Sequence, residues 1–175
     1  FGPFWATLSL GILVLAIGTI YPAVFRQSMS SYMPFLCAGL ILWMPLSNFL
    51  PESGSVLYSA SGIVLQRKIP YTIFILAALF RHLMVMCHHM IIFVIVSIIF
   101  QMVPTPATLL VIPGIVLFLL NGFWVGLLLA IICTRYRDFL QIVTSIVQIL
   151  FFVTPIFWQA KGIEGWRMFI IQLNP

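Results

Sequence analysis

Four residues whose side chains could bind a ligand or move a proton lie close together in an otherwise apolar stretch: Arg81, His82, His88 and His89. On a helix they fall within an arc of roughly 120° on one face. A charged stripe of this kind predicts contact with protein or water rather than with lipid tails. It could form a polar wall along a path for a hydroxyl-rich or anionic substrate. Alternatively, the first two side chains reach the headgroups while the two later histidines hydrogen-bond a neighbouring helix.

Metal binding and acid–base chemistry have little support in the sequence. Adjacent histidines diverge by about 100° on a helix, and no carboxylate is expected on that span. The three carboxylates, Glu52, Asp138 and Glu164, are expected on different loops, where nothing pairs them for proton transfer. The nucleotide-binding pattern G-x-x-x-x-G-K-[ST] does not occur in the sequence. We therefore expect no catalytic residue, no metal and no cofactor in this chain.

Composition predicts an all-α polytopic membrane protein. Hydrophobic residues make up 63% of the 175 positions, against roughly 45–50% in soluble proteins. The net charge is +5, and the basic residues are clustered between apolar runs, which suits anionic lipid headgroups rather than nucleic acid. The three cysteines lie in or beside apolar runs without metal-type spacing, and we interpret them as small membrane residues: Cys37, Cys87 and Cys133.

The hydrophobic runs predict five membrane spans within a single domain over residues 1–175. Residues 52–70 are too polar to span and predict a short amphipathic helix along the surface. Residues 71–80 are expected at the interface, because the apolar run around them exceeds one span and Arg81 divides it. No initiator Met or signal peptide precedes the first run, so we expect the chain to begin within a longer protein. The expected spans are 4–25, 32–50, 83–100, 109–133 and 140–158.

The most compact charged segment is the hexapeptide TRYRDF at residues 134–139, which we call the charged turn. Two arginines and an aspartate cannot be left unpaired in hydrocarbon, so the charged turn must lie in water or at the membrane surface. It is either an ordinary basic loop between two spans or a contact for another protein. The distribution of basic residues favours a cytoplasmic position for it only weakly.

Several short motifs resemble those of one transporter family. The run Arg137-Asp138-Phe139, with Arg135 before it and Phe151-Phe152-x-Thr154-Pro155 after it, resembles the permease subunit of ABC-2-type polysaccharide exporters. Arg81 with His88 resembles the O-antigen branch, although His89 stands where Asn is usual. Further matches follow in the expected order: Gly2-Pro3-x-Trp5, Gly39-x-x-x-Trp43, the segment from Ile63 to Pro70, and Leu173-Asn174-Pro175.

The resemblance implies an ABC-2 exporter transmembrane domain with about five spans present and a broken or re-entrant C-terminal segment. The N-terminal interfacial helix and the last span of the family would be missing. It also implies a homodimeric permease subunit without enzyme activity, exporting a lipid-linked polysaccharide of O-antigen type across the bacterial inner membrane. A separate ATPase subunit would use ATP and Mg²⁺.

The resemblance also implies roles for particular residues. The implied ATPase-coupling residues lie in two loops: Gln66, Arg67, Lys68, Arg135, Arg137 and Asp138. The periplasmic re-entrant segment would contain Trp158, Trp166 and Arg167.

Three other interpretations stay open at this point. An ABC-2 permease for another cargo, such as a drug or a teichoic acid precursor, would share the loop motifs. An ATP-independent carrier would usually need an intramembrane carboxylate, which none of the predicted spans carries. A membrane enzyme that uses His88 and His89 would turn over its substrate without a partner.

Overall fold

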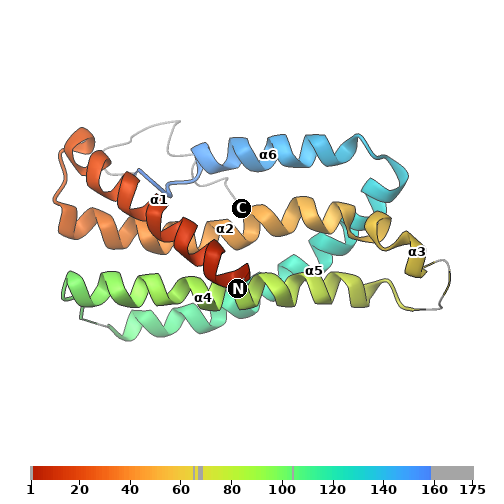
Figure 1. Ribbon diagram of the computed structural model, residues 1–175, viewed down its shortest axis with the longest axis horizontal. Coiled ribbons are helices and arrows are strands. Elements are labelled where there is room, and N and C mark those ends of the chain that lie inside the picture. The colour runs from red at the N-terminus through yellow and green to blue at the C-terminus, as the bar shows by residue number, and fades with distance from the viewer. Residues whose placement is uncertain (1, 65, 67–68, 104, 159–175) are drawn as a thin grey trace. The chain divides into compact units, whose positions relative to one another are not determined.

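Helices account for all regular structure in the described part of the chain, residues 2–64, 66, 69–103 and 105–158 of a computed structural model (Figure 1). The sequence prediction of an all-α protein is confirmed. The elements in chain order are α1 (Gly2–Phe25), α2 (Met29–Ser59), α3 (Ser61–Val64), α4 (Thr72–Ile99), the 3-10 helix η1 (Pro106–Leu110), α5 (Val111–Arg135) and α6 (Phe139–Val153).

Four helical segments in the described residues are long and apolar enough to cross a membrane. Each is longer than the roughly 20 residues that a bilayer requires, whereas α6 has 15 residues and is shorter. This pattern identifies a multi-pass membrane protein. The four candidate spans are Phe4–Phe25, Met29–Ser59, Thr72–Ile99 and Thr108–Arg135.

Helix α4 is continuous through Arg81 and His82, where the sequence analysis places a boundary. Its 28 residues contain neither proline nor glycine, so nothing in the backbone interrupts the hydrogen-bonded ladder. The prediction of a separate interfacial segment at residues 71–80 is therefore wrong, because α4 begins at Thr72 and continues through Arg81. Both residues lie on one long helix together with the apolar residues before them.

Helix α2 extends to Ser59, beyond the predicted end at residue 50. The polar residues in this extension bond to their own helix. The Ser53 hydroxyl donates to the Leu50 carbonyl at 2.7 Å, and the Ser55 hydroxyl donates to the Glu52 carbonyl at 3.0 Å. These bonds satisfy the two hydroxyls within the helix, and the segment continues α2 up to Ser59 instead of forming the separate surface helix that the sequence predicts.

Helix α6 ends at Val153, whereas the sequence analysis predicts a span up to residue 158. The Thr154 backbone N–H and side-chain hydroxyl both bond the Leu150 carbonyl, at 2.8 and 2.7 Å. Pro155 follows, and a proline has no N–H with which to continue the ladder. The helix therefore ends at Val153, directly before Thr154.

The chain forms two compact units, and the first comprises residues 2–44, 85–102 and 148–158. Here α1 packs closely on α2, since a Cβ at Gly18 would collide with the side chain of Met33. The segment after α6 packs on the first half of α2: the Tyr32 hydroxyl donates to the Phe157 carbonyl at 2.5 Å. A Cβ at Gly39 would lie 3.1 Å from the Ile156 carbonyl oxygen, so the small residue permits this approach.

The second unit lies within residues 45–84 and 103–147 and has a hydrophobic core around Phe49 of α2. Two glycines four residues apart let α5 approach this ring: a Cβ at Gly126 would lie 2.7 Å from Phe49 Cζ, and one at Gly122 would lie 3.5 Å from Phe49 Cε1. Small residues at this spacing bring membrane helices together. The fully or largely buried core residues are Phe49, Ile75, Ala78, Leu79 and Ala130.

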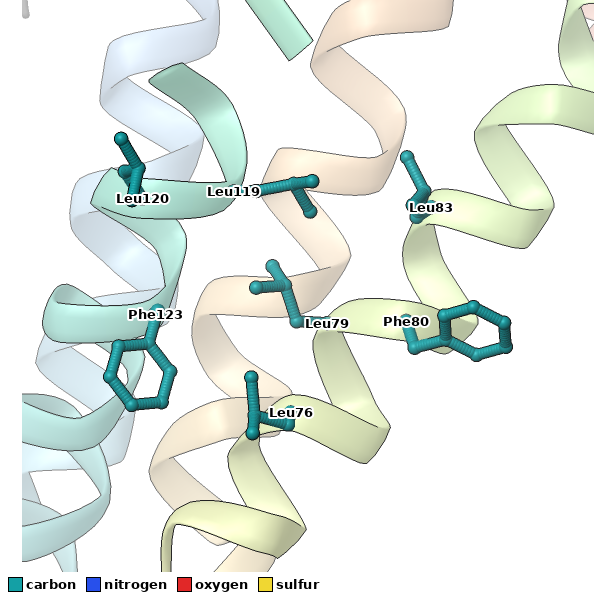
Figure 2. A pocket seen from close by; sticks show the side chains of 7 residues that line it. All are labelled: Leu76, Leu79, Phe80, Leu83, Leu119, Leu120 and Phe123. Carbon is teal, nitrogen blue, oxygen red and sulfur yellow. The ribbon is translucent and has the colours of Figure 1, made fainter. Parts of the chain in front are cut away.

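An apolar groove of about 490 Å³ lies between α4 and α5 in the second unit (Figure 2). Its walls carry only hydrocarbon side chains, so it is suited to lipid chains or to another apolar surface. The lining residues are Leu76, Leu79, Phe80, Leu83, Leu119, Leu120 and Phe123.

Candidate functional site

The charged turn connects α5 to α6, because α5 ends at Arg135 and α6 begins at Phe139. The Tyr136 N–H donates to the Ile132 carbonyl at 2.8 Å and closes the last turn of α5. Arg135 lies in that last turn, where a cation is favoured by the partial negative charge of the helix end. Asp138 is exposed just before α6, where an anion is favoured for the opposite reason.

Arg137 ties the charged turn to the end of α2. Its guanidinium carbon lies 4.3 Å from the centroid of the Tyr58 ring, within the range of a cation–π interaction. A small hollow of about 150 Å³ adjoins this contact and is lined by Gly54, Cys133 and Leu140 besides the two partners and Ser55. A Cβ at Gly54 would lie 3.0 Å from Cys133 Sγ, so a larger residue there would require the Cys133 side chain to shift.

The second predicted coupling segment follows the same end of α2. Helix α3 comes directly after α2, and the Gln66 N–H donates to the Ile63 carbonyl at 3.2 Å. Arg67 and Lys68 lie outside the described residues. Because Tyr58 touches Arg137, the structure brings the end of α2 and the charged turn together at one end of the second unit (Figure 1).

The polar stripe on α4 belongs to two different units. Arg81 and His82 lie in the second unit, whereas His88 and His89 lie in the first. Arg81 and His82 both bind the Glu52 carboxylate of α2: the Arg81 guanidinium donates to Oε1, and His82 Nε2 lies 2.9 Å from Oε2. We call these three residues the Glu52 cluster.

The Glu52 cluster corrects the sequence analysis, which places Glu52 on a surface segment without a partner. The residue was missed because Pro51 and the following Glu-Ser-Gly-Ser look like a loop, and only the continuation of α2 puts the carboxylate beside α4. The exposed fraction of the side chains rises along the cluster, from 9% for His82 through 33% for Glu52 to 62% for Arg81. The Phe49 ring meets the His82 imidazole edge-on at 5.9 Å.

The two later histidines of the stripe differ in environment. His88 is exposed, while His89 is buried and neither of its ring nitrogens bonds to any described residue. A role for either of them in a translocation path stays a prediction. Within the described ranges no group of three or more His, Cys, Asp or Glu residues could hold a metal ion.

The predicted periplasmic residues are only partly described. The Trp158 indole N–H donates to the Phe152 carbonyl at 3.1 Å, which folds the segment after α6 back on the helix end. Trp166 and Arg167 lie outside the described residues, as does the rest of the predicted re-entrant segment.

Comparison with known families identifies the class of this membrane protein. The family model described as "ABC-2 type transporter" matches residues 1–175, so the chain belongs to the ABC-2 type transporter family. The chain is thus a transporter permease, from a family that generally works with an ATPase partner. No curated protein matches the sequence significantly.

Proposed function

We propose that the chain is the permease subunit of an ATP-driven exporter that moves a lipid-linked polysaccharide of O-antigen type across the bacterial inner membrane. The permease acts as a homodimer, and ATP and Mg²⁺ are used by a separate ATPase subunit. The family match supports transport. The cargo rests on the motif resemblance, above all Arg137-Asp138-Phe139 with Thr154-Pro155 after it and Arg81 with His88 before it.

The contact between Arg137 and Tyr58 carries the coupling part of the proposal. An ATPase that pushes on the charged turn would displace α5 and α6, which the turn joins, and also α2 through Tyr58. Coupling between two sites requires an element with two arrangements that both sites influence. The helices that meet at this end of the second unit are the candidates for that element.

Co-purification from membranes tests the coupling site. The full-length permease is expressed with the ATPase encoded beside it, as wild type, as Arg135→Glu/Arg137→Glu, and as the control Arg26→Glu. We expect the ATPase to be retained by the wild type and the control and lost from the double variant, because the charge reversal removes both cations of the charged turn. Retention of the ATPase by the double variant would exclude the charged turn as the contact.

The cargo needs its own assay. Membrane vesicles that contain the permease and its ATPase are supplied with a lipid-linked O-antigen-type polysaccharide or with a teichoic acid precursor. We expect ATP-dependent transfer of the first and not of the second. Transfer of only the teichoic acid precursor would support an ATP-driven permease but would show that its cargo is not the O-antigen-type polysaccharide.

The Glu52 cluster reopens one alternative that the sequence analysis disfavours. An ATP-independent carrier usually needs an intramembrane carboxylate, and the structure places Glu52 on the candidate span α2. However, both Glu52 oxygens already have partners, as in a structural ion pair. The same vesicles without ATP decide between the two, because a carrier would continue to transport.

A further inference from the structure

Arg81 occupies an unusual place for an exposed cation. Of the described arginines, the others lie in turns or at the last residue of a helix, whereas Arg81 is about 14 Å along α4 from Thr72. Its side chain is 62% exposed on a candidate span. The neighbouring Phe80 and Met84 are also exposed. A guanidinium on a candidate span is costly in hydrocarbon unless it pairs with polar groups or reaches the level of the headgroups.

The Glu52 cluster holds this guanidinium in one orientation. His82 is buried against Phe49 and bonds one carboxylate oxygen of Glu52, and the other oxygen accepts a hydrogen bond from Arg81. An arginine has five N–H donors in a planar fork, so one bond to Glu52 leaves donors for a second anion. Phosphate oxygens match this fork particularly well.

The direction of the side chain also fits an anionic headgroup. Long side chains on a helix lean toward its N-terminus, which for α4 is the end that follows α3. The Arg81 guanidinium therefore reaches toward the same end of the second unit as the charged turn. An amphiphile whose charged group lies at that level would place its hydrocarbon chains farther along α4, beside Met84.

We propose that Arg81 binds the phosphate group of an anionic lipid, with Glu52 and His82 as positioning residues that fix the guanidinium. Two sources share this chemistry: a bilayer phospholipid and the diphosphate of a lipid-linked sugar. The apolar groove of Figure 2 is not part of this site, because Arg81 lies about 100° around α4 from its neighbour Phe80, which lines the groove. The proposed lipid site does not depend on the cargo proposed above.

Lipid retention by the purified full-length protein tests the site. The protein is reconstituted with equal amounts of phosphatidylglycerol and phosphatidylcholine, extracted, and analysed by native mass spectrometry for bound lipid. We expect the wild type to retain phosphatidylglycerol preferentially. Arg81→Gln should lower that preference about fivefold, the effect of one basic residue at a membrane surface, while Arg81→Lys retains most of it.

Two further variants control for the loss of a positive charge and for misfolding. Arg26→Gln removes a positive charge elsewhere and should leave the preference unchanged. The double variant Glu52→Gln/Arg81→Gln is used if Arg81→Gln alone fails to fold. It removes the proposed phosphate site, and it leaves no unpaired carboxylate because Glu52 is replaced as well. The proposal is overturned if the preference survives in folded Arg81→Gln, if it survives in the double variant where Arg81→Gln does not fold, or if it falls equally in Arg26→Gln.

A competition arm distinguishes the two lipid sources. A polyprenyl diphosphate is added to the wild-type protein loaded with phosphatidylglycerol. Displacement of the phospholipid by the polyprenyl diphosphate, absent in Arg81→Gln, would assign the site to the diphosphate of a lipid-linked sugar. Retention of the phospholipid would assign it to the bilayer lipid.

Discussion

At the scale of single residues, the Glu52 cluster joins α2 to α4 in the second unit. A carboxylate on a candidate span is costly unless its charge is balanced and its oxygens are hydrogen-bonded, and Arg81 and His82 do both. Breaking one side of such a pair leaves the other charge uncompensated. Removing both charges together avoids that penalty, and this asymmetry gives a test.

We expect Glu52→Gln and Arg81→Gln each to lower the free energy of unfolding by about 1–3 kcal/mol, a range between exposed and buried ion pairs. The double variant should cost less than the sum of the two, with a coupling energy of about 0.5–3 kcal/mol. Unfolding of the full-length protein in detergent, followed by intrinsic fluorescence, gives the four values of the cycle. Simple additivity would show that the two side chains do not interact in the folded protein.

At the scale of helices, close approach depends on where glycine faces a neighbouring helix. Gly126 of α5 faces the buried Phe49 ring, whereas Gly114 of the same helix has open space where a Cβ would be. The two positions lie on the same helix and differ in whether a neighbouring side chain stands where the Cβ would be.

Gly126→Ala should destabilise the protein by about 1–3 kcal/mol, because Phe49 must move to admit the new methyl group. Gly114→Ala should be neutral or stabilising by up to about 1 kcal/mol, since alanine favours helix and nothing obstructs it. Thermal unfolding in detergent compares the two. Phe49→Leu in the Gly126→Ala background should recover part of the loss, and equal effects of the two alanines would contradict the packing described here.

The contact between α2 and the charged turn gives a second test at this scale. Tyr58→Phe keeps the aromatic face beneath Arg137 and should leave ATPase association unchanged, whereas Tyr58→Leu removes an interaction of about 0.5–1 kcal/mol and should weaken association several-fold. Co-purification at graded salt concentrations measures the difference. If both variants behave alike, the ring does not position Arg137 for the partner.

At the scale of the whole molecule, the order of helices sets which connections share a side of the membrane. If α1, α2, α4 and α5 each cross the bilayer, the α1–α2 and α4–α5 connections lie on one side. The α2–α4 connection and the charged turn then lie on the other, which the proposed function makes cytoplasmic.

Single cysteines test this arrangement in a background without Cys37, Cys87 and Cys133. Cysteine at Ser28 or Gln101 should react with a membrane-impermeant maleimide added outside intact spheroplasts. Cysteine at Ser61 or Tyr136 should react only after the membrane is opened. Labelling of Tyr136→Cys in intact spheroplasts would show the opposite topology, in which a cytoplasmic ATPase could not reach the charged turn.

The sequence by itself determined the class of protein and most of its helices. With 63% hydrophobic residues the chain has too little polar surface for water, and long apolar runs must form helices in a membrane because backbone groups have no other partners there. The charged turn was also predictable, since its arginines cannot lie in hydrocarbon. The motif order also indicated the ABC-2 family, and the family match over residues 1–175 confirms that family, whereas the polysaccharide branch stays a prediction.

Only the tertiary structure decided which side chains meet. Glu52 and Arg81 are 29 positions apart on different helices, and their contact depends on how each helix is rotated and how far one is shifted along the other. Helices that are apolar on nearly all sides carry no periodic signal that fixes this rotation. Likewise, nothing in the sequence indicated that Arg137 packs on the Tyr58 ring. The helix ends also differ from the prediction: α2 continues through Ser53 and Ser55, whose hydroxyls bond within the helix, whereas α6 ends before Pro155.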